Sequence, residues 1–518
     1  MKILSSKSSQ GGRSSGAARM LMIAASVLIV TAQSSRATQA DDTSIIFVSK
    51  VGGVSPFIRH LNFVVSPIAN LKSVQFTVQP KPGSVTRPIS ATYSSGYLSS
   101  RGYLDSAGNL KVPVFGLYDG VTNSVTLSYV FRDNSSKQGL FSVVTGAFHD
   151  PCGYKQGTVV KARTLSTSLS YDFMLLKNSC SDFSPALMDT DGALRWVGTA
   201  GISSTASAFF DNAIYLGTGP QLIRIELDGA VSVVGDYSSI GVTGFHHNID
   251  RGKHGLLLEV DTNTDVESVI LEVDRRGGVL NSWNMAKIIS ATMRAAGDDP
   301  SAFVRRGDDW FHNNAVTYRA SDDSLIVSSR ENFVIALDYR SGAIKWILGD
   351  TSKAWYQYPS LRQYALTVPT GGVAPIGQHA VSITYNDKLL LFDNGLPSFN
   401  QTPPGNGRTF AVPRKYSLNL NNRTASQIFS YNLQIISQIC GSVYEDAPDN
   451  YLVDYAVAGG YQSGNAFAEI VALQATGQRV FDYKYPTTFC AEIFNALPIH
   501  LEQLSFPTAS PAFADTAP

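Results

Sequence analysis

Hydrophobic and polar positions alternate in short runs along most of the chain. Between residues 43 and 145, segments such as SIIFVSKV, LNFVVSP and SVTLSYVFRD are rich in Val, Phe and Thr and end near Pro or Gly. Runs of this length and composition are typical of β-strands that bury one face. We therefore expect a small N-terminal β-sandwich domain over residues 43–145.

A weak repeat begins near Ala186. Each copy has a hydrophobic strand, an acidic or polar residue, a turn residue and a second hydrophobic strand, as in ALMDTDGALRWVG and VIALDYRSGAIKWILG. The turn residues of the six copies are Gly192, Gly229, Gly278, Gly342, Asn422 and Gly477. Repeated four-stranded units form β-propellers, so we predict an all-β fold with a six-bladed propeller over residues 150–500. The one clear helical run, MAKIISATMRAA, is expected in a connecting loop.

The two ends of the chain differ from the rest. Residues 1–40 combine early Lys and Arg, the apolar run MLMIAASVLIVTA and small residues ending at Ala37 or Ala40, which is the order of a secretory signal peptide. The apolar run is short for a bilayer, so cleavage is favoured over an uncleaved anchor. The mature protein is expected to be periplasmic or secreted, without a membrane partner. Residues 506–518, rich in Pro, Ala and Ser, are expected to be a disordered tail.

Cysteine content and charge agree with export. The four cysteines, an even number, indicate disulfides in an oxidising compartment: Cys152, Cys180, Cys440 and Cys490. Proximity favours Cys152–Cys180 and Cys440–Cys490, although four cysteines allow three pairings. Lys plus Arg and Asp plus Glu balance at 41 each, and no basic patch is interleaved with aromatic residues. Nucleic acid is therefore not an expected partner.

Three segments place a histidine at the same point of the repeat, just before an inner-strand hairpin. They are FHHNIDRGKHGLLLEV, DDWFHNNAVTYRASDDSLIVSSR and GQHAVSITYNDKLLLFDNG. The repeat register selects His247 (beside His246), His312 and His379, and pseudo-symmetry would direct these side chains toward the mouth of the central channel. Arg330 ends the strand that returns toward His312. The predicted site thus holds imidazoles and a guanidinium, without convergent carboxylates.

This set of side chains suits the transfer of a tetrahedral oxyanion group. A guanidinium binds sulfate or phosphate through paired charged hydrogen bonds. Neutral imidazole is a nucleophile, and a second histidine can carry the proton of a phenol. Phosphoryl transfer usually recruits a metal, so the less charged sulfuryl group is favoured. Three histidines could instead bind zinc, but only their number supports that, and we expect no metal and no cofactor.

These segments resemble the bacterial arylsulfate sulfotransferase family over residues 182–485. The strongest match is DDWFHNNAVTY, which fits the family's Asp-Trp-x-His-x-Asn block, and SSREN, IALDYRSGAIKWILGD and FHHNID also match. The resemblance implies a propeller that follows an N-terminal sandwich. It also implies ping-pong transfer of a sulfuryl group from a phenolic sulfate ester to another phenol through a sulfohistidine, without a nucleotide donor. A homodimer is the assembly that the resemblance implies.

The resemblance also implies roles for single residues. His379 matches the sulfated nucleophile, and His312 with Arg330 match the residues that bind and polarise the sulfuryl group. Asn314 closes the matched block and is expected to contact the substrate.

The remaining catalytic position of the family falls on the pair His246 and His247, of which the repeat register favours His247. The family commonly has Asp directly after the histidine of the first and last segments, where this chain has Asn248 and Ala380. If that Asp orients the imidazole, its loss lowers the activity or alters the substrate.

Two other functions fit parts of the chain. One copy of the repeat fits the A-x-D-x-x-x-G-x-x-x-W motif of quinoprotein dehydrogenase blades, through Ala336, Asp338, Gly342 and Trp346, without a calcium-ligand cluster. A non-enzymatic propeller scaffold would bind a partner through its rim and needs no convergent histidines. The relative positions of the imidazoles distinguish these alternatives from a transferase.

Overall fold

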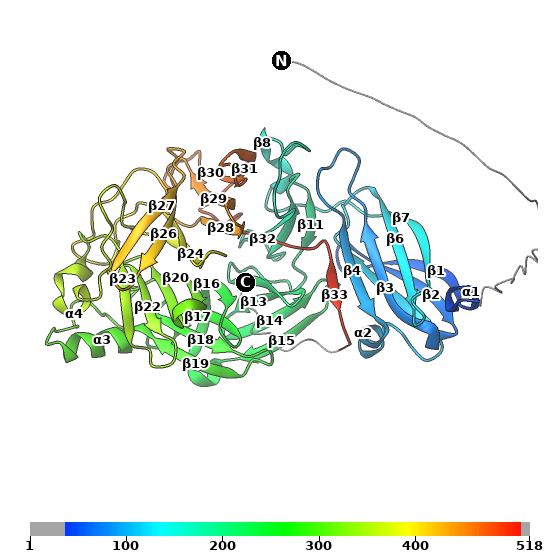
Figure 1. Ribbon diagram of the computed structural model, residues 1–518, viewed down its shortest axis with the longest axis horizontal. Helices are drawn as coiled ribbons and strands as arrows, with labels where there is room; N and C mark the ends of the chain where they lie inside the picture. Colours follow the sequence, from blue (N-terminus) through cyan, green and yellow to red (C-terminus); the bar gives the residue numbers. More distant parts are fainter. Residues whose placement is uncertain (1–36, 509–518) are drawn as a thin grey trace, which may run out of the picture.

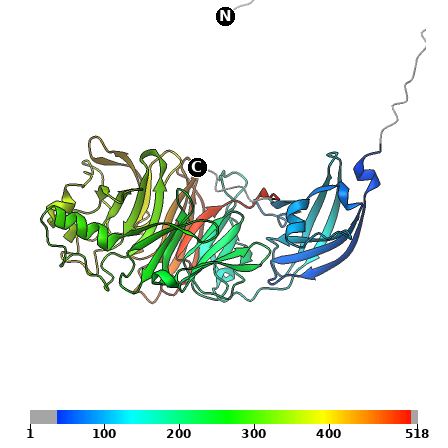
Figure 2. The same cartoon turned by 90° about the horizontal axis from the view of Figure 1, so that it is seen from below.

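The computed structural model describes residues 37–508, which form two β-rich bodies side by side (Figure 1). The blue N-terminal body lies at one end and the teal to orange blades lie at the other, a division that Figure 2 shows from below. Within the described part of the chain, no helix is long and apolar enough to cross a membrane. Residues 1–36 of the predicted signal peptide and 509–518 of the predicted tail lie outside the described residues.

The N-terminal domain is a sandwich of two sheets, as predicted. One sheet has the order β1 (Ser44–Gly52), β2 (Ile58–Ser66), β5 (Asn109–Phe115). The other has the order β33 (Leu504–Phe506), β4 (Ile89–Ser94), β3 (Leu71–Val78), β6 (Thr122–Phe131), β7 (Ser136–Val144). Alternate residues of β6, including Val125 and Leu127, are fully buried, so each strand turns one side to the shared core.

Both ends of the described chain pack on this sandwich. Helix α1 (Gln39–Asp42) is capped by Thr38, and the amide of Gln39 donates to Asp133. Ala40 is buried, so a signal peptide that ends at Ala37 would leave α1 whole, whereas one that ends at Ala40 would not. Strand β33 runs parallel to β4 and ends at Phe506, so regular structure reaches the first residue of the predicted tail.

Six blades of four or five strands form the propeller within residues 37–508, as predicted. In blade order, from the inner strand outward, the strands are β32 (Asn495–Ile499), β9 (Phe173–Lys177), β10 (Ala186–Asp189), β11 (Leu194–Val197); β12 (Ser207–Phe210), β13 (Ala213–Thr218), β14 (Gln221–Glu226), β15 (Val231–Asp236); β16 (Val242–Arg251), β17 (Leu256–Thr262), β18 (Val269–Val273), β19 (Val279–Asn284); β20 (Asn313–Arg319), β21 (Ser324–Ser329), β22 (Val334–Asp338), β23 (Ile344–Leu348); β24 (His379–Ile383), β25 (Leu389–Asp393), β26 (Val412–Asn419), β27 (Thr424–Ser430); and β28 (Ser442–Ala447), β29 (Asn450–Ala458), β30 (Phe467–Leu473), β31 (Arg479–Pro486), β8 (Thr158–Lys161). The second and third blades are joined in one eight-stranded sheet by the parallel pairing of Ser207 in β12 with Asn248 in β16. The labels of the inner strands β16, β20, β24, β28 and β32 surround a common centre in Figure 1.

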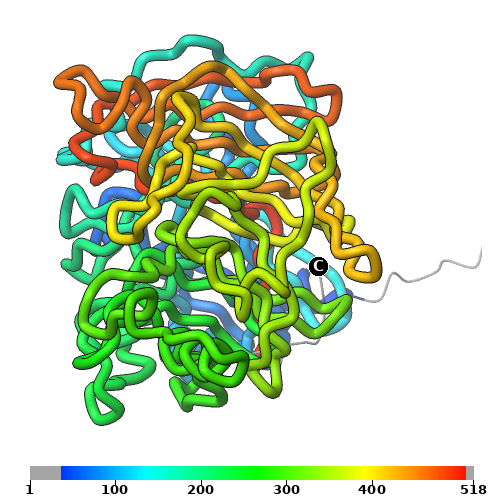
Figure 3. The backbone as a smooth tube through the Cα atoms, turned by 90° about the vertical axis from the view of Figure 1, so that its left-hand side faces the viewer, coloured from blue at the N-terminus to red at the C-terminus, as the bar shows by residue number. Residues whose placement is uncertain are grey.

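The ring is closed from both ends of the chain. Strand β32, near the C-terminal end, pairs with β9, and the early strand β8 pairs with the outer strand β31 of the last blade. Figure 3 looks at the propeller end and shows the blades in front of the blue sandwich. Each turn residue predicted from the repeat lies in the hairpin between the third and fourth strands of its blade. The repeat therefore marks the outer hairpins, whereas the histidine segments mark the inner ones.

Shorter elements connect the blades. The predicted helical run forms α3 (Met285–Ala295) between β19 and β20, and the other short elements are α2 (Ser95–Ser100), α4 (Pro359–Arg362), η1 (Ile68–Asn70), η2 (Tyr154–Gln156), η3 (Ser238–Ile240), η4 (Ala320–Asp322) and η5 (Ala354–Gln357). Both favoured cysteine pairs form disulfides, with Cα atoms 5.6 Å apart in Cys152–Cys180 and 6.6 Å apart in Cys440–Cys490.

The residues of the quinoprotein-type motif build the β22–β23 hairpin. Ala336 and Trp346 are buried between blades, and Oδ1 of Asp338 accepts hydrogen bonds from Ser341. Gly342 takes a positive φ of 70°, which the turn requires. Blade packing and turn geometry thus account for each motif residue.

Candidate active site

Irregular inner strands aim the predicted histidines at the centre of the propeller. The pairing register shifts between Phe245 and Ile249 in β16, between Asn313 and Ala315 in β20, and after His379 in β24. Positive φ angles occur at each place, at His247 (28°), His312 (52°) and Ala380 (51°). Bulges of this kind bend a strand and re-aim its side chains, and left-handed non-glycine residues are strained conformations that concentrate at functional sites.

The bulges bring the four histidines together. Nε2 of His247 lies 3.3 Å from Nε2 of His312, and their ring centroids are 5.2 Å apart. The His379 ring lies 6.3 Å from that of His247, and His246 is 3.6 Å from its neighbour His247. Phe494 of the first blade stacks on His247 at 4.5 Å and is 6.4 Å from His379, so an aromatic wall borders the imidazoles.

Arg330 lies beside His312, as the sequence predicts. Its amide donates to the carbonyl oxygen of His312 at 3.0 Å, and Nη2 is 3.5 Å from Oδ2 of Asp309. Nε donates to Glu331 at 2.8 Å, and the Phe399 ring covers the guanidinium at 4.9 Å. Within residues 37–508, these contacts leave Nη1 without a hydrogen-bond acceptor. One edge of the guanidinium therefore stays available to an anion.

A buried carboxylate holds both Arg330 and the loop above it. Glu331 is fully buried, and its Oε2 accepts hydrogen bonds from the Ser398 hydroxyl and from the amides of Phe399 and Asn400. Asn400 in turn donates to the carbonyl oxygen of Asp309 at 2.6 Å. Glu331 thus ties the guanidinium to the loop that brings Phe399 onto it.

His379 is held as a neutral imidazole with a defined tautomer. Its Nδ1 lies 2.8 Å from Oδ1 of Asn394, and Nδ2 of Asn394 donates to the carbonyl oxygens of Ser437 and Cys440, each at 2.8 Å. With Nδ2 committed to two acceptors, Oδ1 can only accept, so Nδ1 of His379 carries the proton. Burial lowers the pKa of His379 to about 3. The lone pair at Nε2 is therefore free for nucleophilic attack.

His312 has the opposite character. Burial alone would lower its pKa, but Asp309, whose Oδ2 lies 2.8 Å from Nδ1, and Glu267 outweigh burial and raise that pKa. Burial, followed by the neighbouring imidazoles, lowers the pKa of His247 well below its ordinary value. The cluster therefore combines one imidazole with a raised pKa, His312, and two with lowered pKa values, His247 and His379. General acid–base catalysis uses pairs of groups whose pKa values are separated in this way.

The expectation of a site without carboxylates is wrong. Glu267, Asp309 and Glu331 all reach the cluster, because a loop between β17 and β18 supplies Glu267 and the other two flank His312 and Arg330 closely in the chain. Asp309 could have been predicted, because it precedes His312 by three residues in the Asp-Trp-x-His motif. A single glutamate in a loop of unknown path offers no such signal, so Glu267 was missed.

Comparisons with known proteins match both domains of the chain. The family model described as arylsulfotransferase (ASST) matches residues 158–493, and the model of the arylsulfotransferase Ig-like domain matches residues 62–146. The chain belongs to the arylsulfotransferase family. The two models cover the chain from the sandwich to the last blade.

Individual relatives are more distant. The arylsulfate sulfotransferase AssT of Escherichia coli O6:H1 is 26% identical over 32% of this chain and 35% of its own length, and AssT of Lelliottia amnigena is 22% identical over the same shares. The aligned part thus spans about a third of these relatives. Among solved structures, the β-propeller domain of Cps50 (Swd1) from Myceliophteria thermophila aligns with a TM-score of 0.33, at 9% identity, over 64% of this chain and 100% of that domain. The propeller assignment accordingly comes from the sheet order of this chain.

Asn248 and Ala380, the two departures from the family pattern, have structural explanations in this chain. Asn394, from the end of β25, orients His379, so the position of Ala380 is not needed for that contact. Oδ1 of Asn248 accepts a hydrogen bond from the buried Lys177, so this side chain is engaged by Lys177 rather than by the neighbouring His247 ring. Asn314 donates from Nδ2 to the carbonyl oxygen of Gln378 at 2.7 Å, while its Oδ1 is buried and unpartnered. The unpartnered oxygen of this amide is therefore available to a ligand.

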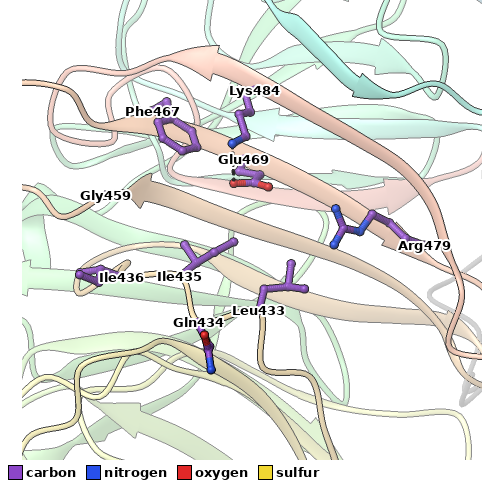
Figure 4. Close-up of a pocket in the computed structure, with 9 residues that line it drawn as sticks. All are labelled: Leu433, Gln434, Ile435, Ile436, Gly459, Phe467, Glu469, Arg479 and Lys484. Atoms are coloured by element: carbon purple, nitrogen blue, oxygen red, sulfur yellow. Dashed lines mark ion pairs between the residues drawn. The ribbon is translucent and has the colours of Figure 1, made fainter.

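A hollow elsewhere on the propeller lacks such chemistry. It measures about 380 Å³ and lies between the segment Leu433–Ile436 and strands β30 and β31 (Figure 4). Lys484 and Glu469, 3.6 Å apart, face one another in it, and Arg479 lies nearby. No histidine lines it, so the imidazole cluster remains the candidate active site.

Proposed function

We propose that this protein transfers a sulfuryl group from a phenolic sulfate ester to another phenol, through a covalent adduct on Nε2 of His379. The observation that carries the proposal is the neutral, Asn394-bound His379 beside the proton-rich His312 and the open edge of Arg330. Family membership supports the same reaction class.

In the first half-reaction, Nε2 of His379 attacks the sulfur of the donor. The new N–S bond forms as the S–O bond to the aryl oxygen breaks, and the leaving oxygen takes a proton from the His247–His312 pair. Nη1 of Arg330 and the cationic His312 stabilise the charge on the sulfuryl oxygens. The first phenol then departs and leaves the sulfated His379.

The second half-reaction reverses these changes. The acceptor phenol gives its proton to the His247–His312 pair while its oxygen attacks the sulfur. The N–S bond breaks and its electron pair returns to Nε2 of His379, which restores the starting protonation state. Oδ1 of Asn314 is proposed to contact the substrate, and His246 to support its neighbour His247.

Steady-state kinetics with 4-nitrophenyl sulfate as the donor and phenol as the acceptor test the reaction. A ping-pong mechanism predicts parallel double-reciprocal lines as the acceptor concentration varies. His379→Ala is expected to abolish 4-nitrophenol release, and His254→Asn, an exposed histidine outside the cluster, is the matched control. Release that survives His379→Ala would contradict the assigned nucleophile.

Export, removal of the signal peptide and a homodimeric state belong to the same proposal. N-terminal sequencing of the secreted or periplasmic chain and light scattering of the purified protein test them. A mature chain that begins before Thr38, or a monomer at working concentration, would contradict these parts without affecting the chemistry.

A further inference from the structure

A second set of donor atoms lies on the far edge of the His312 ring. Nε2 of His312 faces His247, whereas Nδ1, on the opposite edge, faces Oδ2 of Asp309 and Oε2 of Glu267. Nε2 of His246 reaches the same glutamate oxygen at 2.8 Å. Two carboxylates thus converge at Nδ1 of His312, and the His246 imidazole borders them on the Glu267 side.

Several of these donor atoms lack a conventional partner. Although Nε2 of His246 and Oε2 of Glu267 are close, both are buried and neither is aligned for a hydrogen bond with a protein atom of the described chain. Oδ1 of Asp309 is also buried and unpartnered. Buried polar atoms are nearly always satisfied, so such a group of exceptions in one place calls for a shared ligand.

The local charge favours a cation. Glu267 and Asp309 line the point directly, and Asp261 lies behind Glu267, whose amide donates to Oδ1 of Asp261 at 2.7 Å. The nearest fixed cation, Arg330, is 3.5 Å from Asp309 and is engaged by Glu331. A divalent ion would balance the two lining carboxylates.

We propose that His312, Glu267 and Asp309 form a binding site for a divalent transition metal ion, bordered by His246, with zinc as the best match. Zinc prefers four nitrogen, oxygen or sulfur ligands at about 2.0–2.2 Å in a tetrahedron, which places ligand atoms about 3.3 Å apart. The ligand atoms of Glu267, Asp309 and His312 all lie within 4.8 Å of one another. A water would supply the fourth ligand, as in zinc sites with three protein ligands, and the contacts of His312 with Glu267 and Asp309 would lengthen toward this spacing.

Occupation of this site has a consequence for the proposed reaction. A metal ion on Nδ1 of His312 anchors the ring between Asp309 and Glu267, so that its opposite edge, beside His247, can no longer adjust to the substrate. Bound zinc is therefore expected to inhibit sulfuryl transfer. This consequence rests on the proposed function, whereas metal binding itself does not.

Cobalt provides a direct probe of the site. The metal-free full-length chain is titrated with Co²⁺, and the visible d–d absorption of a tetrahedral complex is recorded. We expect a saturable band with a single ion per chain that Zn²⁺ abolishes by competition. Glu267→Gln and Asp309→Asn are each expected to weaken Co²⁺ binding at least about tenfold.

Matched variants and controls keep the outcome clear. Asp308→Asn removes an exposed carboxylate next to Asp309, and His254→Asn removes an exposed histidine, so both should bind Co²⁺ as the unaltered chain does. Thermal unfolding of each variant verifies the fold. Absence of a tetrahedral band, or a band that survives both Glu267→Gln and Asp309→Asn, would overturn the metal site. Sulfuryl transfer measured without metal is a separate readout, so failure of the proposed function is recognised independently.

Discussion

Oδ1 of Asn394 accepts from Nδ1 of His379 at 2.8 Å, and this contact determines which imidazole nitrogen is free. The Asn394 amide is itself oriented by hydrogen bonds to two carbonyl oxygens, so the backbone around it determines the tautomer of His379. Asn394→Ala removes that control. We expect kcat to fall by about 100-fold or more because the proton can then occupy Nε2.

Loss of the Asn394 amide also leaves two buried carbonyl oxygens without donors, at a cost of about 1–3 kcal/mol. Asn123→Ala is the control, since this buried asparagine makes comparable backbone contacts inside the N-terminal sandwich. It should lower the melting temperature and leave kcat unchanged. Equal kcat values for Asn394→Ala and Asn123→Ala would contradict the claim that Asn394 sets the tautomer of His379.

Glu331→Gln tests the support of Arg330. The neutral amide cannot accept from both the guanidinium and the Ser398–Asn400 loop, so the guanidinium loses its fixed orientation. We expect KM for the sulfate donor to rise about tenfold, together with a loss of stability of about 2–5 kcal/mol from the broken buried pair. Glu445→Gln, at a buried pair with Lys415, is the matched control and should lower stability alone.

The two disulfides should differ in their effect on activity. Cys440 presents its carbonyl oxygen to Asn394, and Cys490 begins the segment that ends at Phe494 against His247. Serine substitution of the pair Cys440 and Cys490 is expected to lower kcat as well as stability. The same change at Cys152 and Cys180 should lower stability by a similar amount, about 3–4 kcal/mol for loops of these lengths, and spare kcat.

His500 should give the fold a pH dependence that is independent of the site. Asp446, at 2.9 Å, and Glu502 raise the pKa of His500 to about 10. A raised folded-state pKa stabilises the fold fully below the unfolded value of about 6.5 and loses that effect as pH rises toward 10. The side chain is 54% exposed, so screening limits the effect to about 1 kcal/mol or less.

His500→Gln should therefore lower the melting temperature by about 1–2 °C at pH 6 and by nothing measurable above pH 10. Differential scanning calorimetry across this range makes the comparison. A difference that grows with pH would reverse the sign of the linkage and contradict the assigned pairing.

The sequence repeat and the positions of the histidines within it were enough to predict the propeller, its number of blades and the blades that carry the site. The turn residues from Gly192 to Gly477 lie in six corresponding hairpins. His247 and His379 lie in the inner strands of their blades, and His312 directly precedes the inner strand of the blade between them. The sequence repeat predicts these positions because every blade is a four-stranded sheet with the same arrangement of strands and turns. The strand order of each blade then follows from local hairpins.

Contacts between different segments could not be predicted in this way. Asn394 reaches His379 from the end of the neighbouring strand, and Glu267 reaches His312 from a loop of another blade. Neither residue has a repeat partner, and loops follow paths that no periodicity describes. The strand β33, which returns to the N-terminal sandwich, was likewise hidden because its three residues are too few for a pattern.

The most direct test of the central claim is mass spectrometry of the protein after brief exposure to 4-nitrophenyl sulfate without an acceptor. The account predicts that the peptide containing His379 gains the mass of one sulfuryl group, that phenol removes the label, and that Asn394→Ala slows the labelling. A label on His247 or His312, or a chain that turns over the donor without acquiring any label, would contradict it.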